Sequence, residues 1–241
     1  MKYAIFASRN IKELLRDPFS LLFGIGLPLF LLFIMTALQK SIAVDVFEIK
    51  NFAPGMAIFS FSFISLFSGM LISKDRSNSF LTRLFASPLS ASDYILGYSL
   101  PLIPIAIMQS SICFVVAVFL GLNFNLNIFV AILALIPVSL LFIGIGLLLG
   151  TIFNDKQVGG ITSILIQIIA FSSGMWFDLN LVGGAYKTIS YSLPFSHAVD
   201  LTRAIILNDY SSLIENFLWV IGYTIIIFGF SIIIFRKKMK E

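Results

Sequence analysis

His197 is the single histidine of the chain, and Asp200 and Arg203 follow it at intervals of three residues. Residues at this spacing are neighbours on a helix surface, where opposite charges can pair. The group could form a small polar cluster near a gate, or it could hold a short helix in place through capping bonds and ion pairs. The structural role is favoured because pairs of this kind contribute only about 0.2–0.5 kcal/mol.

Catalytic and metal-binding patterns are absent from the sequence. Ser190, Ser192 and Ser196 lie near His197, but their spacing does not indicate a nucleophile with its base. No GxxxxGK[ST], HExxH or CxxC stretch occurs, and the Gly159-Gly160 pair has no following lysine. The sequence therefore predicts no metal site, no phosphate-binding loop and no catalytic residue.

The elements that must position these residues are strongly apolar. Of the 241 residues, 59% are hydrophobic and 12% are charged, and 26 are phenylalanine. Soluble domains are about 45–50% apolar and about 25% charged. With a mean hydropathy of +1.01, the chain is predicted to be an integral membrane protein. Its one cysteine, Cys113, has no intrachain partner, so no disulfide framework is possible.

Six stretches are long and apolar enough to cross a bilayer, which takes about 20 residues. They are residues 19–38, 54–73, 94–120, 127–152, 158–177 and 213–235. Strictly alternating patterns are absent, so an all-α membrane protein is predicted, not a β-barrel. Pro101, Pro104 and Pro137 lie within these stretches, where kinks are tolerated if neighbouring helices satisfy the freed backbone groups.

The distribution of Lys and Arg predicts the orientation. If both ends face the cytosol, twelve basic residues lie inside and four lie outside, whereas each side carries six acidic residues. The four outer residues are Lys40, Lys50, Lys187 and Arg203. We therefore expect a multi-pass protein of the cell membrane with both termini in the cytosol. The net charge of +4 reflects this topology and does not indicate nucleic-acid binding.

Two basic amphipathic segments lie on the predicted cytosolic side. Residues 1–17 carry Arg9, Lys12, Glu13 and Arg16 on one helical face and apolar residues on the other, which is typical of a helix in the headgroup plane. Its role could be to anchor the N-terminus or to contact a partner. The second segment, residues 74–93, also has an apolar and a polar side. A helix of this kind can rest on the membrane domain and present its polar side to a soluble partner.

The predicted spans carry almost no ionisable residues. Transport coupled to an ion gradient usually needs such residues along its path, so any energy for transport is expected to come from elsewhere. The second and fifth spans are rich in small and hydroxylated residues, which suit either ordinary bundle packing or a subunit interface and pathway wall. The outer residues 178–212 are half apolar and predict one or two short helices that dip back toward the membrane.

Two stretches resemble the ABC-2 type permease family, the transmembrane subunits of bacterial ABC exporters. Residues 76–97, RSNSFLTRLFASPLSASDYILG, are similar to a family stretch with a Leu-x-x-Ser-Pro form followed by a Tyr-Ile-Leu-Gly helix start. Residues 193–207, LPFSHAVDLTRAIIL, look like the family's Pro-x-x-His-x-x-Asp/Glu-x-x-Arg segment before the last span. The family often has Glu-Arg before Gly-Thr, whereas here Asp75-Arg76 precedes Ser77-Asn78-Ser79.

The resemblance implies a single domain over residues 1–241, which pairs with a second or homologous permease copy. It implies two copies of a separate ABC ATPase, which would carry the ATP and Mg²⁺, while this chain would carry no cofactor. Residues 75–88 would form the coupling helix, with Asp75, Arg76, Thr82, Arg83, Ser87 and Pro88 on the docking face. The pathway would be lined by Phe59, Phe63, Phe67, Gln167 and Phe171, and His197, Asp200 and Arg203 would belong to the outer re-entrant region.

The leading expectation is thus an export subunit that moves a drug, peptide, lipid or glycan-type substrate. One alternative is a membrane scaffold or sensor that binds a cytosolic partner and transports nothing. Another is an integral membrane enzyme, for which only His197 with Asp200 approaches a titratable cluster.

Overall fold

The computed structural model describes residues 2–16, 18–42, 44–78, 80–81 and 89–238. In these ranges the chain is helical and contains no strand. The elements are α1 (Lys2–Leu15), α2 (Pro18–Gln39), η1 (Asp45–Phe47), α3 (Ile49–Ser77), α5 (Ala91–Ser99), α6 (Leu102–Phe119), α7 (Leu126–Ile152), α8 (Asp155–Ser172), α9 (Leu179–Val182), α10 (Gly184–Tyr191), α11 (Pro194–Leu207) and α12 (Leu213–Lys238).

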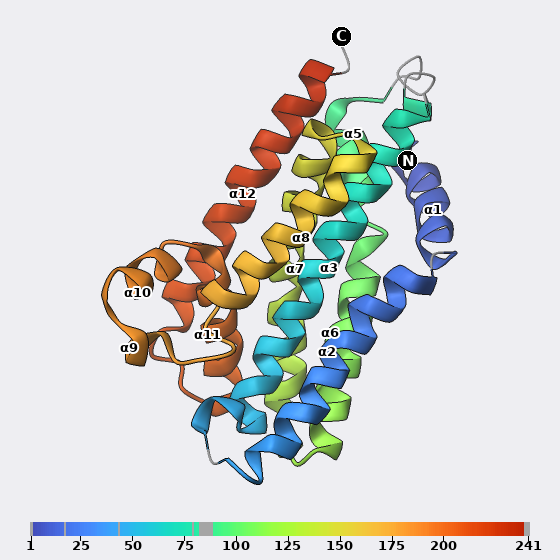
Figure 1. Cartoon of the computed structure of the whole chain (residues 1–241). Helices are drawn as coiled ribbons and strands as arrows, with labels where there is room; N and C mark the ends of the chain where they lie inside the picture. Colours follow the sequence, from blue (N-terminus) through green and yellow to red (C-terminus); the bar gives the residue numbers. More distant parts are fainter. Residues whose placement is uncertain (1, 17, 43, 79, 82–88, 239–241) are drawn as a thin grey trace.

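The long helices run side by side, and the two chain termini lie toward the same end of the bundle (Figure 1). We call this the basic end. Here α1 packs against α5, and α3 ends before the chain continues to α5. The α2–α3 connection and the α6–α7 turn lie at the opposite end (Figure 1). This arrangement matches an even number of crossings between the two termini.

Helix α3 is the centre of the bundle. Residues 49–77 are 89% buried over their most apolar window, whereas the corresponding windows of α2 and α12 are each 17% buried. Helix α3 packs against α2, α6, α7, α8 and α11. The outward side chains of α2 and α12 are large and apolar, as expected of helices that face lipid.

Glycine and serine allow α3 and α7 to approach closely. A Cβ on Gly150 would lie 2.3 Å from the carbonyl oxygen of Gly69, so only glycine fits there. The hydroxyl of Ser65 donates to the carbonyl of Phe142 at 2.7 Å across this contact. The hydroxyl of Ser60 instead donates to a carbonyl of its own helix, that of Ala57. The serines of this span thus support packing within one chain.

The predicted spans agree with the helices in place but differ in their limits. The third span is interrupted at Leu100–Pro101, because Pro101 has no N–H to continue the helical ladder. Helices α6 and α7 continue through Pro104 and Pro137. Helix α8, which corresponds to the fifth predicted span, ends at Ser172. The chain then turns at Gly174, which has a φ of +73°.

Among the described residues, five helical stretches meet the length and apolarity of a membrane span. Helix α8 is not among them, since its first turn carries Asp155, Lys156 and Gln157. The multi-pass membrane class is therefore confirmed, while six crossings remain a prediction. The outer region, predicted as one or two short helices, contains three: α9, α10 and α11.

Candidate functional site

A buried carboxylate joins α1, α3 and α5 at the basic end. Asp75 of α3 has a side chain only 3% exposed. Arg9 of α1 donates to both of its oxygens, with Nη2 at 2.7 Å from Oδ1. The hydroxyl of Tyr98 on α5 donates to Oδ2 at 2.8 Å. A bidentate guanidinium–carboxylate pair of this kind fixes geometry as well as charge.

Further charged groups surround this carboxylate. Arg9 also pairs with Glu13 at 2.5 Å, one turn along α1, and Glu13 reaches Lys74 of α3 at 3.2 Å. We call Arg9, Glu13, Lys74, Asp75 and Tyr98 the inner latch. Burial lowers the pKa of Arg9, but the hydrogen bond and charge of Asp75 outweigh this, so its pKa is raised.

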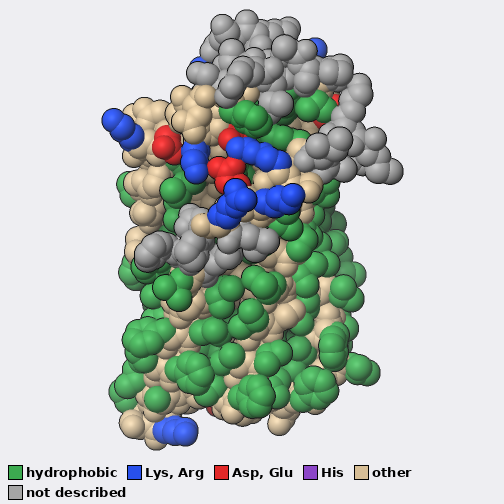
Figure 2. Space-filling view, turned by 90° about the vertical axis from the view of Figure 1, so that its right-hand side faces the viewer, with side chains coloured by type: hydrophobic (Ala, Val, Ile, Leu, Met, Phe, Trp, Pro, Cys, Tyr) green, Lys and Arg blue, Asp and Glu red, His purple; other side chains and the backbone are tan. Residues whose placement is uncertain are grey.

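Apolar and aromatic contacts hold α1 on the latch. The Arg9 guanidinium lies 4.4 Å from the ring centre of Phe80. Phe6 meets the rings of Tyr94 and Tyr98 edge-on, and Asn10 donates to the carbonyl of Gly97 at 3.1 Å. These contacts place α1 across the start of α5, with its charged face beside the end of α3. Figure 2 shows Lys, Arg, Asp and Glu side chains gathered near this end, above a broad hydrophobic surface.

Arg76 ties the same end of α3 to α7. Its guanidinium donates to the carbonyl oxygens of Thr151 and of Phe153, the latter at 2.6 Å. These carbonyls belong to the last turn of α7, where helix geometry leaves them without backbone partners. Adjacent residues Asp75 and Arg76 therefore connect α3 to different neighbours: α1 and α5 on one side, α7 on the other.

The predicted docking residues separate into two groups. Asp75 and Arg76 form the last turns of α3, not the start of a separate helix over 75–88, and both bind other parts of the same chain. Thr82, Arg83, Ser87 and Pro88 lie outside the described residues. Lys12 of α1 and Arg16, just after this helix, are exposed, while Arg9 and Glu13 belong to the inner latch.

The predicted pathway residues do not share one surface. Phe59, Phe63 and Phe67 of α3 are buried within the chain, at 3–7% exposure. Gln167 and Phe171 lie on the exposed side of α8, where Phe171 is 55% exposed. Helix α8 packs directly against α3, so the two groups lie on neighbouring helices.

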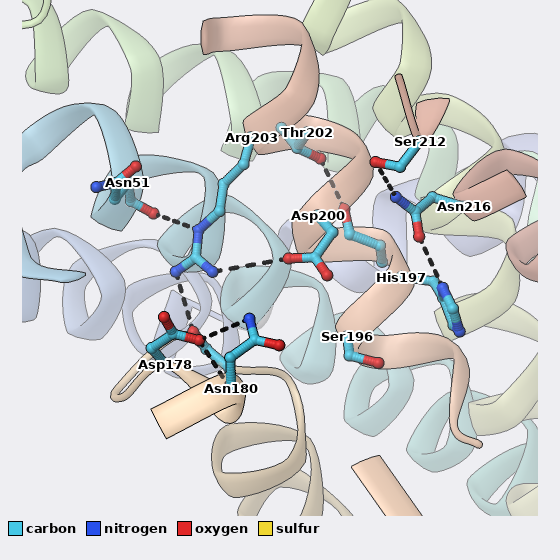
Figure 3. A network of polar contacts seen from close by, with 12 residues as sticks. Asn51, Asp178, Asn180, Ser196, His197, Asp200, Thr202, Arg203, Ser212 and Asn216 are labelled. Atoms are coloured by element: carbon cyan, nitrogen blue, oxygen red, sulfur yellow. Dashed lines mark hydrogen bonds and ion pairs between the residues drawn. The ribbon is translucent and has the colours of Figure 1, made fainter. Parts of the chain in front are cut away.

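Arg203 is the centre of a second polar network (Figure 3), which reaches the start of α3. It extends from α11, and its Nε and Nη2 donate to the carbonyls of Asn51 and Gly174, each at 3.0 Å. Its Nη1 lies 3.8 Å from Asp200, which also accepts a hydrogen bond from the Tyr191 hydroxyl at 3.0 Å. Burial raises the pKa of Asp200 and lowers that of Arg203.

His197 lies apart from this ion pair. Its Nδ1 is 2.7 Å from Asn216 Oδ1 of α12, and its Nε2 is 2.9 Å from the carbonyl oxygen of Tyr191. Its ring stacks on Trp219 with a centroid separation of 4.7 Å. Asp200 and Arg203 thus form the predicted pair, whereas His197 binds α12 instead of joining them. The cluster braces α10, α11 and α12 against one another.

Several partners in these clusters were not predicted from the sequence. Tyr98, Asn10, Asn216 and Trp219 all lie far along the chain from the residues that they contact. The one available signal was Asp75 itself, a carboxylate at the edge of a long apolar block. Within the described ranges, no group of three His, Cys, Asp or Glu residues could hold a metal ion.

Residues 1–207 match the family described as "ABC-2 type transporter". ABC transporter G family member 20 of Dictyostelium discoideum is 24% identical in an alignment of 204 positions, which covers 78% of this chain and 27% of that protein. The chain therefore spans about a quarter of the length of this relative.

Proposed function

The chain belongs to the ABC-2 type transporter family, and from that premise we propose that it is the permease subunit of an exporter driven by a separate ABC ATPase. Two ATPase copies would bind ATP and Mg²⁺ and supply the energy. The cargo would be a drug, peptide, lipid or glycan-type molecule that moves outward across the cell membrane.

The inner latch is the observation that carries this proposal. It joins α1, one basic amphipathic element, to the end of α3, which leads directly into the other. A force applied by an ATPase to α1 would reach α3 through the Arg9–Asp75 pair, and a force on the second element would reach α3 along the chain itself. Because α3 also packs against α2, α6, α7, α8 and α11, its displacement would move much of the membrane domain.

The chemistry of the sequence supports an external energy source. The chain has no GxxxxGK[ST] stretch, and its predicted spans carry almost no ionisable side chains. Neither ATP hydrolysis nor ion coupling therefore has an evident site in these 241 residues. The basic end instead offers exposed cations for a soluble partner.

Orientation and assembly complete the proposal. The excess of Lys and Arg at the basic end supports a cytosolic location for it, with six crossings if α8 counts as the fifth. Two permease copies would then enclose the pathway. Gln167 and Phe171 on the exposed side of α8 would face it first, with Phe59, Phe63 and Phe67 of α3 behind them.

The docking part of the proposal can be tested by charge reversal. Lys12→Glu combined with Arg83→Glu reverses one exposed cation of α1 and one cation of the predicted docking segment, and leaves Arg9, Asp75 and Arg76 unchanged. We expect the amount of co-purifying ATPase to fall at least tenfold relative to the wild type, because like charges would replace opposite charges at the rim of the interface. ATP-driven export from proteoliposomes should fall in proportion.

Lys187→Glu is the matched control, because it reverses an exposed cation at the opposite end. It should leave ATPase binding unchanged. Unchanged binding in the double variant would contradict docking at this face. An ATPase that binds the wild type normally, with no export of any tested cargo, would favour the non-transporting scaffold.

A further inference from the structure

A cavity of about 510 Å³ opens at the end of the bundle opposite the inner latch. Its walls come from the end of α2, the η1–α3 connection, the α6–α7 turn and the end of α11. This is the size range of small-molecule sites. Because it lies where four of the long helices end, it is at the level of lipid head groups if these helices span the bilayer.

The lining combines an apolar wall with cationic groups. Phe47, Leu122 and Ile206 contribute the wall, and the latter two are buried. Lys40 and Lys50 also line the cavity, so it holds two of the four basic residues predicted outside. Lys50 pairs with Glu48 at 2.7 Å. In the part of the chain that the structure describes, no carboxylate pairs with Lys40, so the cavity has an excess positive charge.

Asn125 adds an unsatisfied acceptor to the cavity. It occupies the N-cap position of α7, yet its side chain makes no capping hydrogen bond. Its Oδ1 is buried and has no hydrogen-bond partner. An asparagine at this position usually caps the helix, and a buried acceptor without a partner costs free energy. Both facts are explained if a donor from a ligand completes the site.

We propose that this cavity binds the head group of an acidic, hydroxyl-bearing phospholipid such as phosphatidylglycerol. The phosphate lies against Lys40, a glycerol hydroxyl donates to Asn125 Oδ1 once that side chain turns into the cavity, and the start of the acyl chains covers Phe47, Leu122 and Ile206. Lipid enters from the leaflet that borders this end. Binding of this kind needs no ATPase and is independent of the proposed export.

Native mass spectrometry of the purified full chain in detergent tests this assignment. Phosphatidylglycerol should bind the wild type at least tenfold more tightly than phosphatidylcholine. Both lipids carry an anionic phosphate, but Lys40 repels the quaternary ammonium of phosphatidylcholine, which also has no head-group hydroxyl to donate. Lys40→Gln should remove that preference. Asn123→Trp, a change at an exposed lining residue, should fill the cavity and prevent binding of either lipid there.

Lys187→Gln is the control, since it removes an outer lysine that does not line the cavity. It should bind phosphatidylglycerol like the wild type. Equal affinity for the two lipids, or full retention of the preference in Lys40→Gln, would overturn the site. The last measurement is competition with glycerol 3-phosphate. If this compound displaces the lipid at equal concentration, the cavity binds a soluble phosphate ester instead.

Discussion

Asp75 is held by three donor hydrogen bonds from α1 and α5. A buried carboxylate is stable only if such bonds replace its lost hydration. Arg9 neutralises its charge, while Tyr98 supplies a further donor from a different helix. The acid at the end of α3 therefore depends on residues 66 and 23 positions away in sequence.

Tyr98→Phe isolates one of these bonds. It removes only the hydroxyl, so the ring contacts with Phe6 can persist. We expect the free energy of unfolding to fall by about 1.5–3 kcal/mol, as for hydrogen bonds to charged groups. Unfolding in mixed micelles measures it. Tyr210→Phe, at an exposed tyrosine, should change stability by less than about 0.5 kcal/mol. Equal effects of the two changes would mean that the buried bond is not stabilising.

Asp200 should leave a signature in the pH dependence of stability. Burial raises its folded-state pKa above the ordinary value of 3.8, although Arg203 and Tyr191 partly oppose this. The folded chain therefore keeps the proton to a higher pH than the unfolded chain, and the contribution of Asp200 to stability falls as pH rises through the folded pKa. The stability of the wild type relative to Asp200→Asn should therefore fall as pH rises from about 3.8 through the raised folded-state pKa of Asp200.

Asp209 provides a control of opposite sign. Its pKa is lowered by hydrogen bonds from the side chain and backbone of Ser211. The stability of the wild type relative to Asp209→Asn should therefore rise with pH across the range just below 3.8. If both differences change in the same direction, the shift at Asp200 does not arise from its own burial.

At the scale of helices, the contact between α3 and α7 depends on the absence of side chains. In Gly150→Ala the new Cβ would lie 2.3 Å from both the Gly69 carbonyl oxygen and Ile72 Cγ2. Backbone cannot move aside locally, so the helices must separate, which we expect to cost about 3 kcal/mol. Thermal unfolding in detergent measures the loss.

Two other glycines calibrate that loss. Gly222 on α12 has open space where a Cβ would be, so Gly222→Ala should be neutral or stabilise by up to about 1 kcal/mol through helix propensity. Gly69→Ala, with its nearest contacts at 3.0 Å, should be intermediate and remain measurable if Gly150→Ala does not fold. A loss in Gly222→Ala as large as in Gly150→Ala would refute the packing argument.

Helix positions could be predicted from the sequence better than helix limits. Apolar length located each long helix, because burial in lipid or core requires it. It did not predict that α3 continues through Ser77, since Asp75 and Arg76 remain helical by binding α1, α5 and α7. Charge pattern alone also cannot distinguish a cation that faces a partner from one that binds its own chain. Arg76 was assigned to the first class, and its side chain binds carbonyls of α7.

At the scale of the whole molecule, α8 has an exposed side that does not suit lipid. Ser163 and Gln167 are exposed there, one turn apart, with Gly160 on the same side. A glutamine amide in hydrocarbon lacks hydrogen-bond partners, whereas small residues allow a second helix to approach. The exposed side of α12 is instead occupied by large apolar residues such as Ile225 and Ile233. We therefore expect α8, and not α12, to contact a second copy of the chain.

Oxidative cross-linking in membranes tests this expectation. Ser163→Cys or Gln167→Cys should form a disulfide-linked dimer when the pathway between the two copies is closed, because equivalent positions on symmetry-related helices then approach within the roughly 7 Å that a disulfide needs between Cα atoms. The native Cys113 is buried and should not react. Ile233→Cys, on the lipid-facing side of α12, is the control and should stay monomeric on denaturing gels. If the α8 cysteines give no more dimer than Ile233→Cys, the contact between subunits lies elsewhere. Gln167 would then bind something other than a second copy.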